Sequence, residues 1–312
     1  MNKNRYLIIG GNSFIGINIT QTLLREGNYV KVFTRNSEKI PQNILKNVEL
    51  LKGDLACSED IKHALSNIDI AIYLASTSNV STSTNNIFQD TQNIILFLNF
   101  MEIVKNCSIK RVIFASSGGT VYGEPNYLPV DENHVLKPLS PYGITKVAIE
   151  NYLYFYKCRY GIDFTICRYS NPYGKHQDPF KGVGAINFFL YKHLLNKPIS
   201  IYGDPAKIIR DYIYIDDLVN ATILLASKSE LASNIYNIGS GEGFSLQQII
   251  QEIEILTKRE VKSIYYPSKN TNVQQIVLDI KRVSTELNWK PKIDLKAGIA
   301  LNKLWVEELL SI

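Results

Sequence analysis

The stretch YLIIGGNSFIG, from Tyr6 to Gly16, decides the fold of this chain. An apolar run typical of a buried strand ends at Gly10, and the segment Phe14–Arg25 follows with its apolar residues at helical spacing. Gly10 permits a tight turn out of the strand, Gly16 permits close packing of helix on strand, and the helix N-terminus offers N–H groups to phosphate. Ser13 stands where such a turn usually has its middle glycine, so it adds a Cβ but also a hydroxyl that can donate to a phosphate oxygen. The pattern predicts a strand–turn–helix unit that binds a dinucleotide.

Further strands and helices alternate after this unit. Strands are predicted at residues 29–34, 48–54, 68–76, 110–117 and 163–169, and helices at 59–65, 87–105 and 142–159. The alternation implies right-handed crossovers and a parallel sheet. Beyond about residue 170 turn-rich pieces mix with predicted helices at 185–195 and 246–257. We therefore expect an α/β fold: a Rossmann-like doubly wound parallel sheet in residues 1–168, and a smaller C-terminal substrate-binding lobe in residues 169–312, some of whose segments return to the first domain.

Composition excludes several classes of protein. Apolar residues make up 45% of the chain, which is enough for a full core, and the net charge of +5 comes from scattered Lys and Arg, which does not favour a nucleic-acid site. Cys57, Cys107, Cys158 and Cys167 have no metal-ligand spacing and are expected to be reduced thiols, and no metal site is expected. The N-terminus lacks a signal-peptide pattern and no apolar run reaches the ~18 residues of a membrane span, so a cytoplasmic protein is predicted.

The end of the second predicted strand bears on the choice of cofactor. An NAD site usually has an acidic residue there for the adenosine ribose, whereas an arginine suits the 2′-phosphate of NADP. Here Thr34 takes the acidic position and Arg35 follows it. The pattern favours tolerance of NADP(H), and the alternative is an Arg35 that is merely solvated. Asp54, after the third predicted strand, is placed to accept from an adenine amino group, so the expected cofactor is NAD or NADP.

Tyr142 and Lys146 are four residues apart in SPYGITK, so both side chains lie on one face of the predicted helix. An ammonium beside a phenol stabilises the phenolate and lowers the pKa of the tyrosine from about 10 toward neutrality. Tyr142 is then able to act as general acid or base on a sugar hydroxyl or ketone.

At this point the sequence resembles a known family, the extended short-chain dehydrogenase/reductases, and within it the NAD-dependent epimerase/dehydratase group that acts on nucleotide sugars and includes UDP-glucose 4-epimerases. The resemblance spans nearly the whole chain. The motifs that carry it, in order, are GGNSFIG, KGD, IYLAS, SSGGTVYG, SPYGITK, CRYSNPYG, PISIYGD and RDYIYIDD.

The resemblance implies roles for individual residues. Tyr142 would be the catalytic acid/base, and Lys146 would also bond the nicotinamide ribose. Asn171 would hold the diphosphate of the nucleotide sugar, and the alternative is that it only caps a turn. Arg210 would contact a phosphate, and the alternative is that it only pairs with a neighbouring carboxylate. The full set of residues expected at the cofactor is Gly10, Ser13, Phe14, Ile15, Gly16, Arg35, Asp54, Leu55, Leu74, Tyr142 and Lys146. The residues expected near the nucleotide base are Ile201 and Tyr202, and the carboxylates that offer Arg210 an alternative partner are Asp211, Asp216 and Asp217.

The chain also departs from the family pattern. The Ser or Thr partner of the catalytic tyrosine is replaced by Gly118, so Ser117 or Thr120 is expected to supply that hydroxyl. In the helix predicted at residues 87–105, Asn93 of the family pattern is kept. The small residues that follow this asparagine in the family are replaced here by Leu96 and Phe97. The polar stretch Ser76–Asn86 is interpreted either as a flexible loop or as a loop that lines the site, since ligands bind at the carboxyl ends of parallel strands.

Two activities follow from this resemblance. The first expectation is a reductase of an NDP-4-keto-6-deoxyhexose, such as dTDP-4-dehydro-6-deoxyglucose, in surface-polysaccharide sugar biosynthesis, because Ser13, Thr34 and Arg35 suggest an exchangeable cofactor. The alternative is a UDP-glucose or UDP-N-acetylglucosamine 4-epimerase with tightly bound NAD. A dehydratase is disfavoured because no Asp-Glu pair precedes Tyr122, and a non-catalytic sensor or nucleic-acid binder because Tyr142 and Lys146 are both present. The resemblance further implies a homodimer formed through the helix of Tyr142.

Overall fold

The computed structural model describes residues 3–268 and 273–311, and its centre is a seven-stranded sheet in which every neighbouring pair is parallel. The strand order is β10-β6-β5-β4-β1-β2-β3, so the chain adds β2 and β3 on one side of β1 and then β4, β5, β6 and β10 on the other side, as in a doubly wound fold. The strands are β1 (Arg5–Ile9), β2 (Tyr29–Thr34), β3 (Glu49–Lys52), β4 (Ile70–Tyr73), β5 (Arg111–Ser117), β6 (Phe164–Tyr169) and β10 (Ile235–Ile238).

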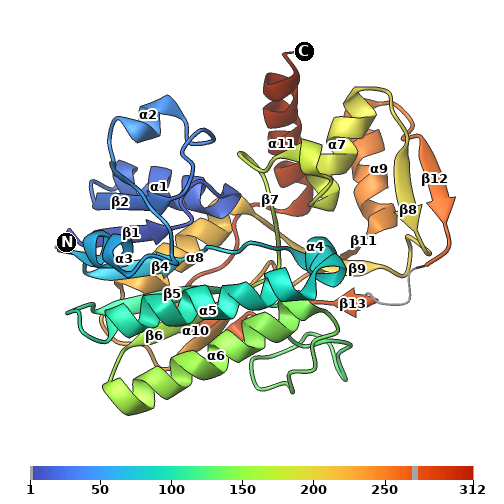
Figure 1. Ribbon diagram of the computed structural model, residues 1–312. Helices are drawn as coiled ribbons and strands as arrows, with labels where there is room; N and C mark the ends of the chain where they lie inside the picture. The colour runs from blue at the N-terminus through green and yellow to red at the C-terminus, as the bar shows by residue number, and fades with distance from the viewer. Residues whose placement is uncertain (1–2, 269–272, 312) are drawn as a thin grey trace.

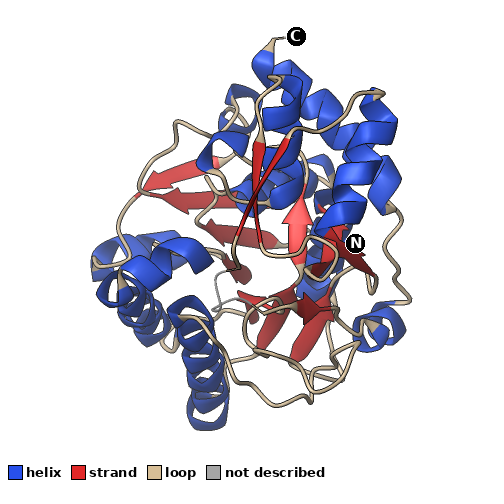
Figure 2. Ribbon diagram, turned by 90° about the vertical axis from the view of Figure 1, so that its right-hand side faces the viewer, coloured by secondary structure: helices blue, strands red, loops and turns tan. Residues whose placement is uncertain are grey.

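Helices cover both faces of this sheet (Figures 1 and 2). Alternate residues of β1 point to opposite faces: Leu7 packs with α3, α5 and α6, whereas Ile8 packs with α1 and α8. Both faces of the sheet are therefore buried under helices, which explains why the strands are almost continuously apolar. The bounds of these helices are α1 (Phe14–Arg25), α3 (Ser58–Leu65), α5 (Ile87–Val104), α6 (Pro141–Tyr160) and α8 (Ile215–Ser227), and two shorter helices are α2 (Gln42–Leu45) and α10 (Lys281–Leu287).

A smaller lobe lies beside the sheet and contains the helices α7, α9 and α11 together with short strands (Figure 1). Its mixed sheet is built on β9, which pairs with β7 and β13 in parallel and with β11 in antiparallel, and a second sheet pairs β8 with β12. The bounds are β7 (Asn171–Tyr173), α7 (Ala185–Leu194), β8 (Ile199–Tyr202), β9 (Ile209–Tyr214), β11 (Gly243–Ser245), α9 (Leu246–Thr257), β12 (Ser263–Tyr266), β13 (Gln275–Ile276) and α11 (Leu295–Leu310), with a 3-10 turn at Pro179–Lys181. The predicted fold class is confirmed.

The stretch Ser76–Asn86, expected to be a loop, contains a short helix, α4 (Val80–Asn85). Hydrogen bonds of Asn79 stabilise the start of this helix. Its Oδ1 accepts from the N–H of Thr82, and its own backbone N–H donates to the Thr82 hydroxyl. Such reciprocal bonds satisfy two N–H groups at a helix start. Across residues 3–268 and 273–311, every helix is too short or too polar to cross a membrane.

Candidate functional site

The glycine turn after β1 has the geometry that only glycine allows. Gly10 has a φ of +81°, and a Cβ there would lie 3.0 Å from the backbone nitrogen of Ala75. A Cβ on Gly16 would lie 2.7 Å from the carbonyl oxygen of Gly10. The two glycines therefore allow the start of α1 to lie against the ends of β1 and β4. Phe14 and Ile15, which were expected at the cofactor, are the first two residues of this helix.

Ser13 is the N-cap of α1, and its hydroxyl oxygen accepts from the N–H of Gly16 at 3.1 Å. The serine therefore satisfies one of the N–H groups that every helix start leaves open. Accepting this bond leaves the hydroxyl proton available to a phosphate, so the residue in the place of a middle glycine is compatible with the expected cofactor.

A cavity of about 350 Å³, here called the cofactor pocket, lies at the carboxyl ends of β1, β2 and β4. Arg35 and Asp54 lie on its wall beside Thr34, whose hydroxyl donates to the carbonyl oxygen of Asn36 at 2.9 Å. Of the residues expected at the cofactor, the cavity brings together Gly10, Ser13, Arg35, Asp54, Leu55 and Leu74. The turn and this pocket are compatible with a dinucleotide whose diphosphate would lie at the start of α1.

Tyr142 and Lys146 lie on one face of α6, with the ammonium nitrogen 5.4 Å from the centre of the phenol ring. The ammonium also donates to the carbonyl oxygen of Ala115 at 2.8 Å. Burial lowers the pKa of Lys146 to about 8, against the opposite effects of the Asp90 and Glu150 carboxylates. Burial, with a further contribution from Asp90, raises the pKa of Tyr142 to about 12. The structure therefore gives Tyr142 a raised pKa in place of the expected fall, because burial disfavours the phenolate.

Asp90 on α5 is a residue of the site that the sequence analysis missed. Its carboxylate is 1% exposed and accepts from the hydroxyls of Ser78 and Thr145. One helical turn later, the Oδ1 of Asn93 accepts from the N–H of Thr77 at 2.8 Å. These bonds tie the segment after β4 to α5 and α6, and this segment does line the cofactor pocket. A sequence signal existed: an acidic residue one turn before Asn93 on the same helix face.

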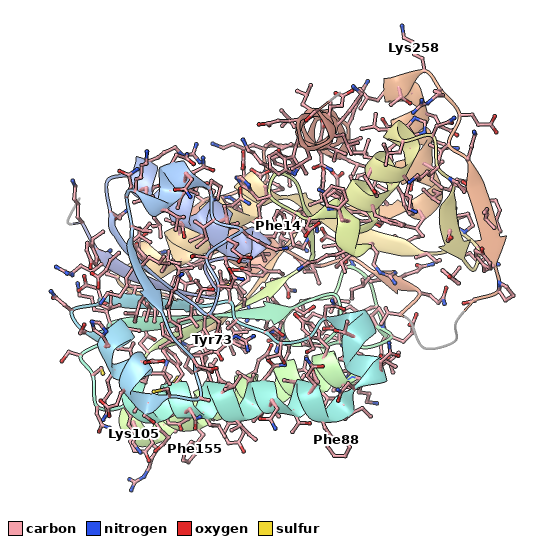
Figure 3. The ribbon with its side chains drawn as sticks, turned by 45° about the horizontal axis from the view of Figure 1, so that its top comes forward. Phe14, Tyr73, Phe88, Lys105, Phe155 and Lys258 are labelled. Atoms are coloured by element: carbon pink, nitrogen blue, oxygen red, sulfur yellow. The ribbon has the colours of Figure 1, made fainter. Side chains whose placement is uncertain are left out.

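The departures from the family pattern have steric explanations. A Cβ on Gly118 would lie 2.6 Å from Cδ1 of Leu278, so a serine or threonine there would require the Leu278 side chain to shift. Ser117 and Thr120 are both half-buried nearby, and the Thr120 hydroxyl lies 3.4 Å from the carbonyl oxygen of Ser117. Phe97 fills a fully buried site and packs edge-on against the ring of Tyr73, with 5.0 Å between ring centres (Figure 3 labels Tyr73).

A second cavity of about 250 Å³, here called the lobe pocket, contains Asn171 and Arg210 on its wall. The Asn171 amide donates to the carbonyl oxygen of Asp211 at 3.0 Å. The Arg210 guanidinium donates to three carbonyl oxygens, including that of Val273 at 2.6 Å. Among the described residues Arg210 makes no ion pair with the three carboxylates considered above, and Asp211 instead accepts from Ser240 at 2.7 Å.

Ile201 and Tyr202, expected near the nucleotide base, do not line the lobe pocket as the described residues define it. Ile201 is 1% exposed and belongs to the apolar core. Tyr202 is 44% exposed and its ring stacks on that of Tyr266 with 5.0 Å between ring centres. No group of three or more His, Cys, Asp and Glu side chains able to hold a metal ion occurs within residues 3–268 and 273–311.

Comparisons with known proteins agree with this geometry. The model of the NAD dependent epimerase/dehydratase family matches residues 6–239. A protein of Methanocaldococcus jannaschii provisionally named a UDP-glucose 4-epimerase is 37% identical over 96% of this chain and 98% of its own length. The dTDP-4-dehydro-6-deoxyglucose reductase of Escherichia coli is 34% identical over 95% of this chain and 96% of its own. The crystal structure of the UDP-glucose 4-epimerase of Thermotoga maritima with UDP-glucose superposes with a TM-score of 0.91 at 30% identity, covering 98% of this chain and 99% of that one. With its glycine turn, cofactor pocket and Tyr142–Lys146 pair, the chain is an enzyme of the NAD-dependent epimerase/dehydratase family.

Proposed function

We propose that the protein is a 4-epimerase whose substrate is UDP-glucose or UDP-N-acetylglucosamine. We further propose that it keeps NAD bound through its catalytic cycle. The observation that supports the proposal is the position of Tyr142 and Lys146, which lie on one helix face, with the Lys146 ammonium against the carbonyl oxygen of Ala115 in β5. The similarity to the Thermotoga maritima epimerase supports this alternative better than the reductase that the cofactor residues first suggested.

In this proposal bound NAD supplies the oxidant and, later, the reductant at the sugar carbon. Tyr142 accepts the proton of the C4 hydroxyl and returns it after the keto sugar has presented its other face. Lys146 holds its positive charge beside the phenol ring and, against the effect of burial, stabilises the phenolate form of Tyr142, which is the form that accepts this proton. The hydroxyl of Ser117 or Thr120 donates to the same sugar oxygen, in place of the hydroxyl that Gly118 lacks. Asn171 and Arg210 hold the diphosphate while the sugar turns.

A reductase of an NDP-4-keto-6-deoxyhexose is the second candidate. It is favoured by the 34% identity to the Escherichia coli reductase and by Arg35, an exposed cation on the cofactor pocket with no carboxylate at position 34. This candidate requires a cofactor that leaves after every turnover, and NADP(H) would then be accepted because nothing acidic at Thr34 repels its 2′-phosphate.

The two candidates differ in what happens to the cofactor. The purified protein is denatured to identify any retained nucleotide, and the native protein is incubated with UDP-glucose, UDP-N-acetylglucosamine and dTDP-4-dehydro-6-deoxyglucose, with and without NAD(P)H. Retained NAD and epimer formation without added cofactor are expected. Consumption of NAD(P)H with the keto sugar alone would replace the epimerase by the reductase.

Tyr142→Phe is expected to lower turnover by a factor of ~100 or more while cofactor binding persists.

We also propose that the protein is a homodimer formed through α5 and α6. Phe88 and Ile95 are seven residues apart on α5, and Ile144 and Phe155 are eleven apart on α6, so each pair lies on one side of its helix. All four side chains are at least 48% exposed. Figure 3 shows Phe88 and Phe155 on the outer side of these helices, directed away from the sheet. Apolar side chains gathered on a surface in this way are typical of a protein interface.

A further inference from the structure

A layer of polar side chains is buried at the carboxyl ends of β5 and β6, on the face of the sheet that α5 and α6 cover (Figure 1). The earlier residues of the two strands on this face are apolar: Val112, Phe114, Phe164 and Ile166. The next positions carry Ser116 and Arg168, which are neighbours in the parallel register. Arg168 is 2% exposed, and Glu150 of α6 is 5% exposed. An apolar side chain would continue the pattern at position 168, so the buried charge there needs an explanation.

The guanidinium of Arg168 joins three separate parts of the chain by hydrogen bonds. It donates to both carboxylate oxygens of Glu150, at 2.6 and 3.2 Å. Its Nη1 donates to the hydroxyl oxygen of Tyr122 at 3.0 Å and to the carbonyl oxygen of Glu132 at 3.2 Å. The hydroxyl of Ser116 in turn donates to Oε1 of Glu150 at 2.5 Å. The carboxylate of α6 is therefore bonded to both β5 and β6.

Two of the partners of Arg168 belong to the two segments proposed to act on the sugar. Glu150 lies one helical turn after Lys146 on α6. Tyr122 lies two residues after Thr120, in the segment that follows β5. Arg168 therefore connects the helix of the catalytic pair with the segment of the candidate hydroxyl donors. Arg168, Glu150 and Tyr122 line neither the cofactor pocket nor the lobe pocket as the described residues define them, so Arg168 acts on a ligand only through its neighbours.

Stability alone does not account for a buried ion pair at this place. Taking two charges out of water opposes folding, and apolar side chains of similar volume often stabilise a core as well as a buried ion pair or better. The guanidinium instead supplies direction, because its N–H groups form a rigid planar fork. The fork holds the carboxylate of Glu150 and the hydroxyl of Tyr122 at fixed distances and angles, which apolar contacts do not do.

We propose that Arg168 is a positioning residue, which fixes α6 relative to the segment after β5 so that Tyr142 and the second hydroxyl reach the same oxygen of the sugar. The inference goes beyond the proposed function and rests on it for the role of Tyr142. A misplacement of about 1 Å in a reacting group can lower a rate about 100-fold. Loss of the fork should therefore lower kcat, whereas KM and the amount of bound cofactor should change little, since Arg168 lines neither pocket.

The double variant Glu150→Met, Arg168→Met removes the pair without leaving one buried charge behind. It is expected to resist urea at least as well as the wild type, and to turn over the wild-type substrate with a kcat at least tenfold lower and an unchanged KM. Arg168→Lys keeps the positive charge but not the fork, so its kcat should fall as well.

The matched control removes the ion pair at the opposite end of the same two strands. There Nε of Arg111 in β5 donates to the carboxylate of Asp163, which precedes β6, at 2.6 Å. The control variant Arg111→Met, Asp163→Leu is expected to keep kcat within twofold of the wild type. If the Arg168 variants keep kcat as well as this control does, the positioning role is overturned.

A double-mutant cycle separates positioning from general support of the fold. Once Tyr142→Phe has removed the phenol hydroxyl, little is left for Arg168 to position, so the methionine pair should lower kcat less than threefold in that background. The same fold loss in both backgrounds would contradict the assignment. Near-normal turnover of Tyr142→Phe by itself would overturn the proposed function and this inference with it, so the two failures are told apart by different variants.

Discussion

Burial is the main cause of the pKa shifts of the pair proposed to act on the sugar, and Asp90 is the one carboxylate among the described residues that acts on both members of the pair. Its carboxylate raises the pKa of both Tyr142 and Lys146, since a negative charge favours the protonated form of each. Activity that needs a protonated Lys146 should fall as the pH rises through about 8. Asp90→Asn removes the charge, so both pKa values fall, and the alkaline decline of kcat/KM should move down by about one pH unit.

The control for this measurement is Glu59→Gln, which removes a carboxylate that is 78% exposed on α3. Its pH profile should match that of the wild type. An unchanged alkaline decline in Asp90→Asn, in protein that retains its cofactor and its far-UV circular dichroism, would show that Asp90 only supports the fold.

The second prediction about a single residue concerns Arg35 and the preference of the protein for NAD or NADP. The side chain is exposed on the cofactor pocket, and in Arg35→Asp the new carboxylate would repel a 2′-phosphate and accept from a ribose hydroxyl. We expect the ratio of NAD to NADP affinity to rise at least tenfold, measured by titrating each cofactor into protein stripped of nucleotide. A ratio equal to that of the wild type would mean that Arg35 is merely solvated.

The residues of the site could be predicted from the sequence where local spacing determines them. The glycine turn and the i, i+4 pair of Tyr142 and Lys146 belong to this class. The environment of the pair could not be predicted, because Asp90 reaches it from another helix and the pKa of Tyr142 depends on desolvation. The same holds for Gly118, where the side chain that a Cβ would meet is Leu278, 160 residues later in the chain.

At the scale of elements, the spacing of apolar residues was sufficient to predict a helix where helical spacing was the dominant pattern. The predicted bounds of α1 and α9 coincide with the observed Phe14–Arg25 and Leu246–Thr257. The helix α4 was missed because Ser, Thr and Asn side chains cap turns and helices equally well. Its formation is supported by a long-range contact, the bond from the N–H of Tyr142 to the Ser83 hydroxyl at 3.3 Å, which no local pattern contains.

The N-cap of α1 gives a prediction about this element. Ser13→Ala removes the oxygen that accepts from the N–H of Gly16, and should lower the free energy of unfolding by about 1 kcal/mol. Ser13→Gly also removes the hydroxyl but should cost only a few tenths of a kcal/mol, because glycine suits an N-cap. Urea unfolding of the two variants beside the wild type measures the difference. An unfolding free energy of Ser13→Ala equal to that of the wild type would show that the hydroxyl does not stabilise α1.

At the scale of the whole molecule, the apolar face of α5 and α6 predicts the assembly. Both helices pack against the sheet through one side, and their opposite side carries Phe88, which is 88% exposed, and Phe155, which is 51% exposed. Light scattering after size-exclusion chromatography should give the mass of a dimer for the wild type and of a monomer for the double variant Phe88→Ser, Phe155→Ser. Tyr265→Ser on β12 is the control, because this ring is 62% exposed on the lobe and its loss should leave the dimer intact. A monomeric wild type, or a double variant that remains dimeric, would place the interface elsewhere, whereas a monomer that still retains NAD would show that each chain forms its cofactor pocket alone.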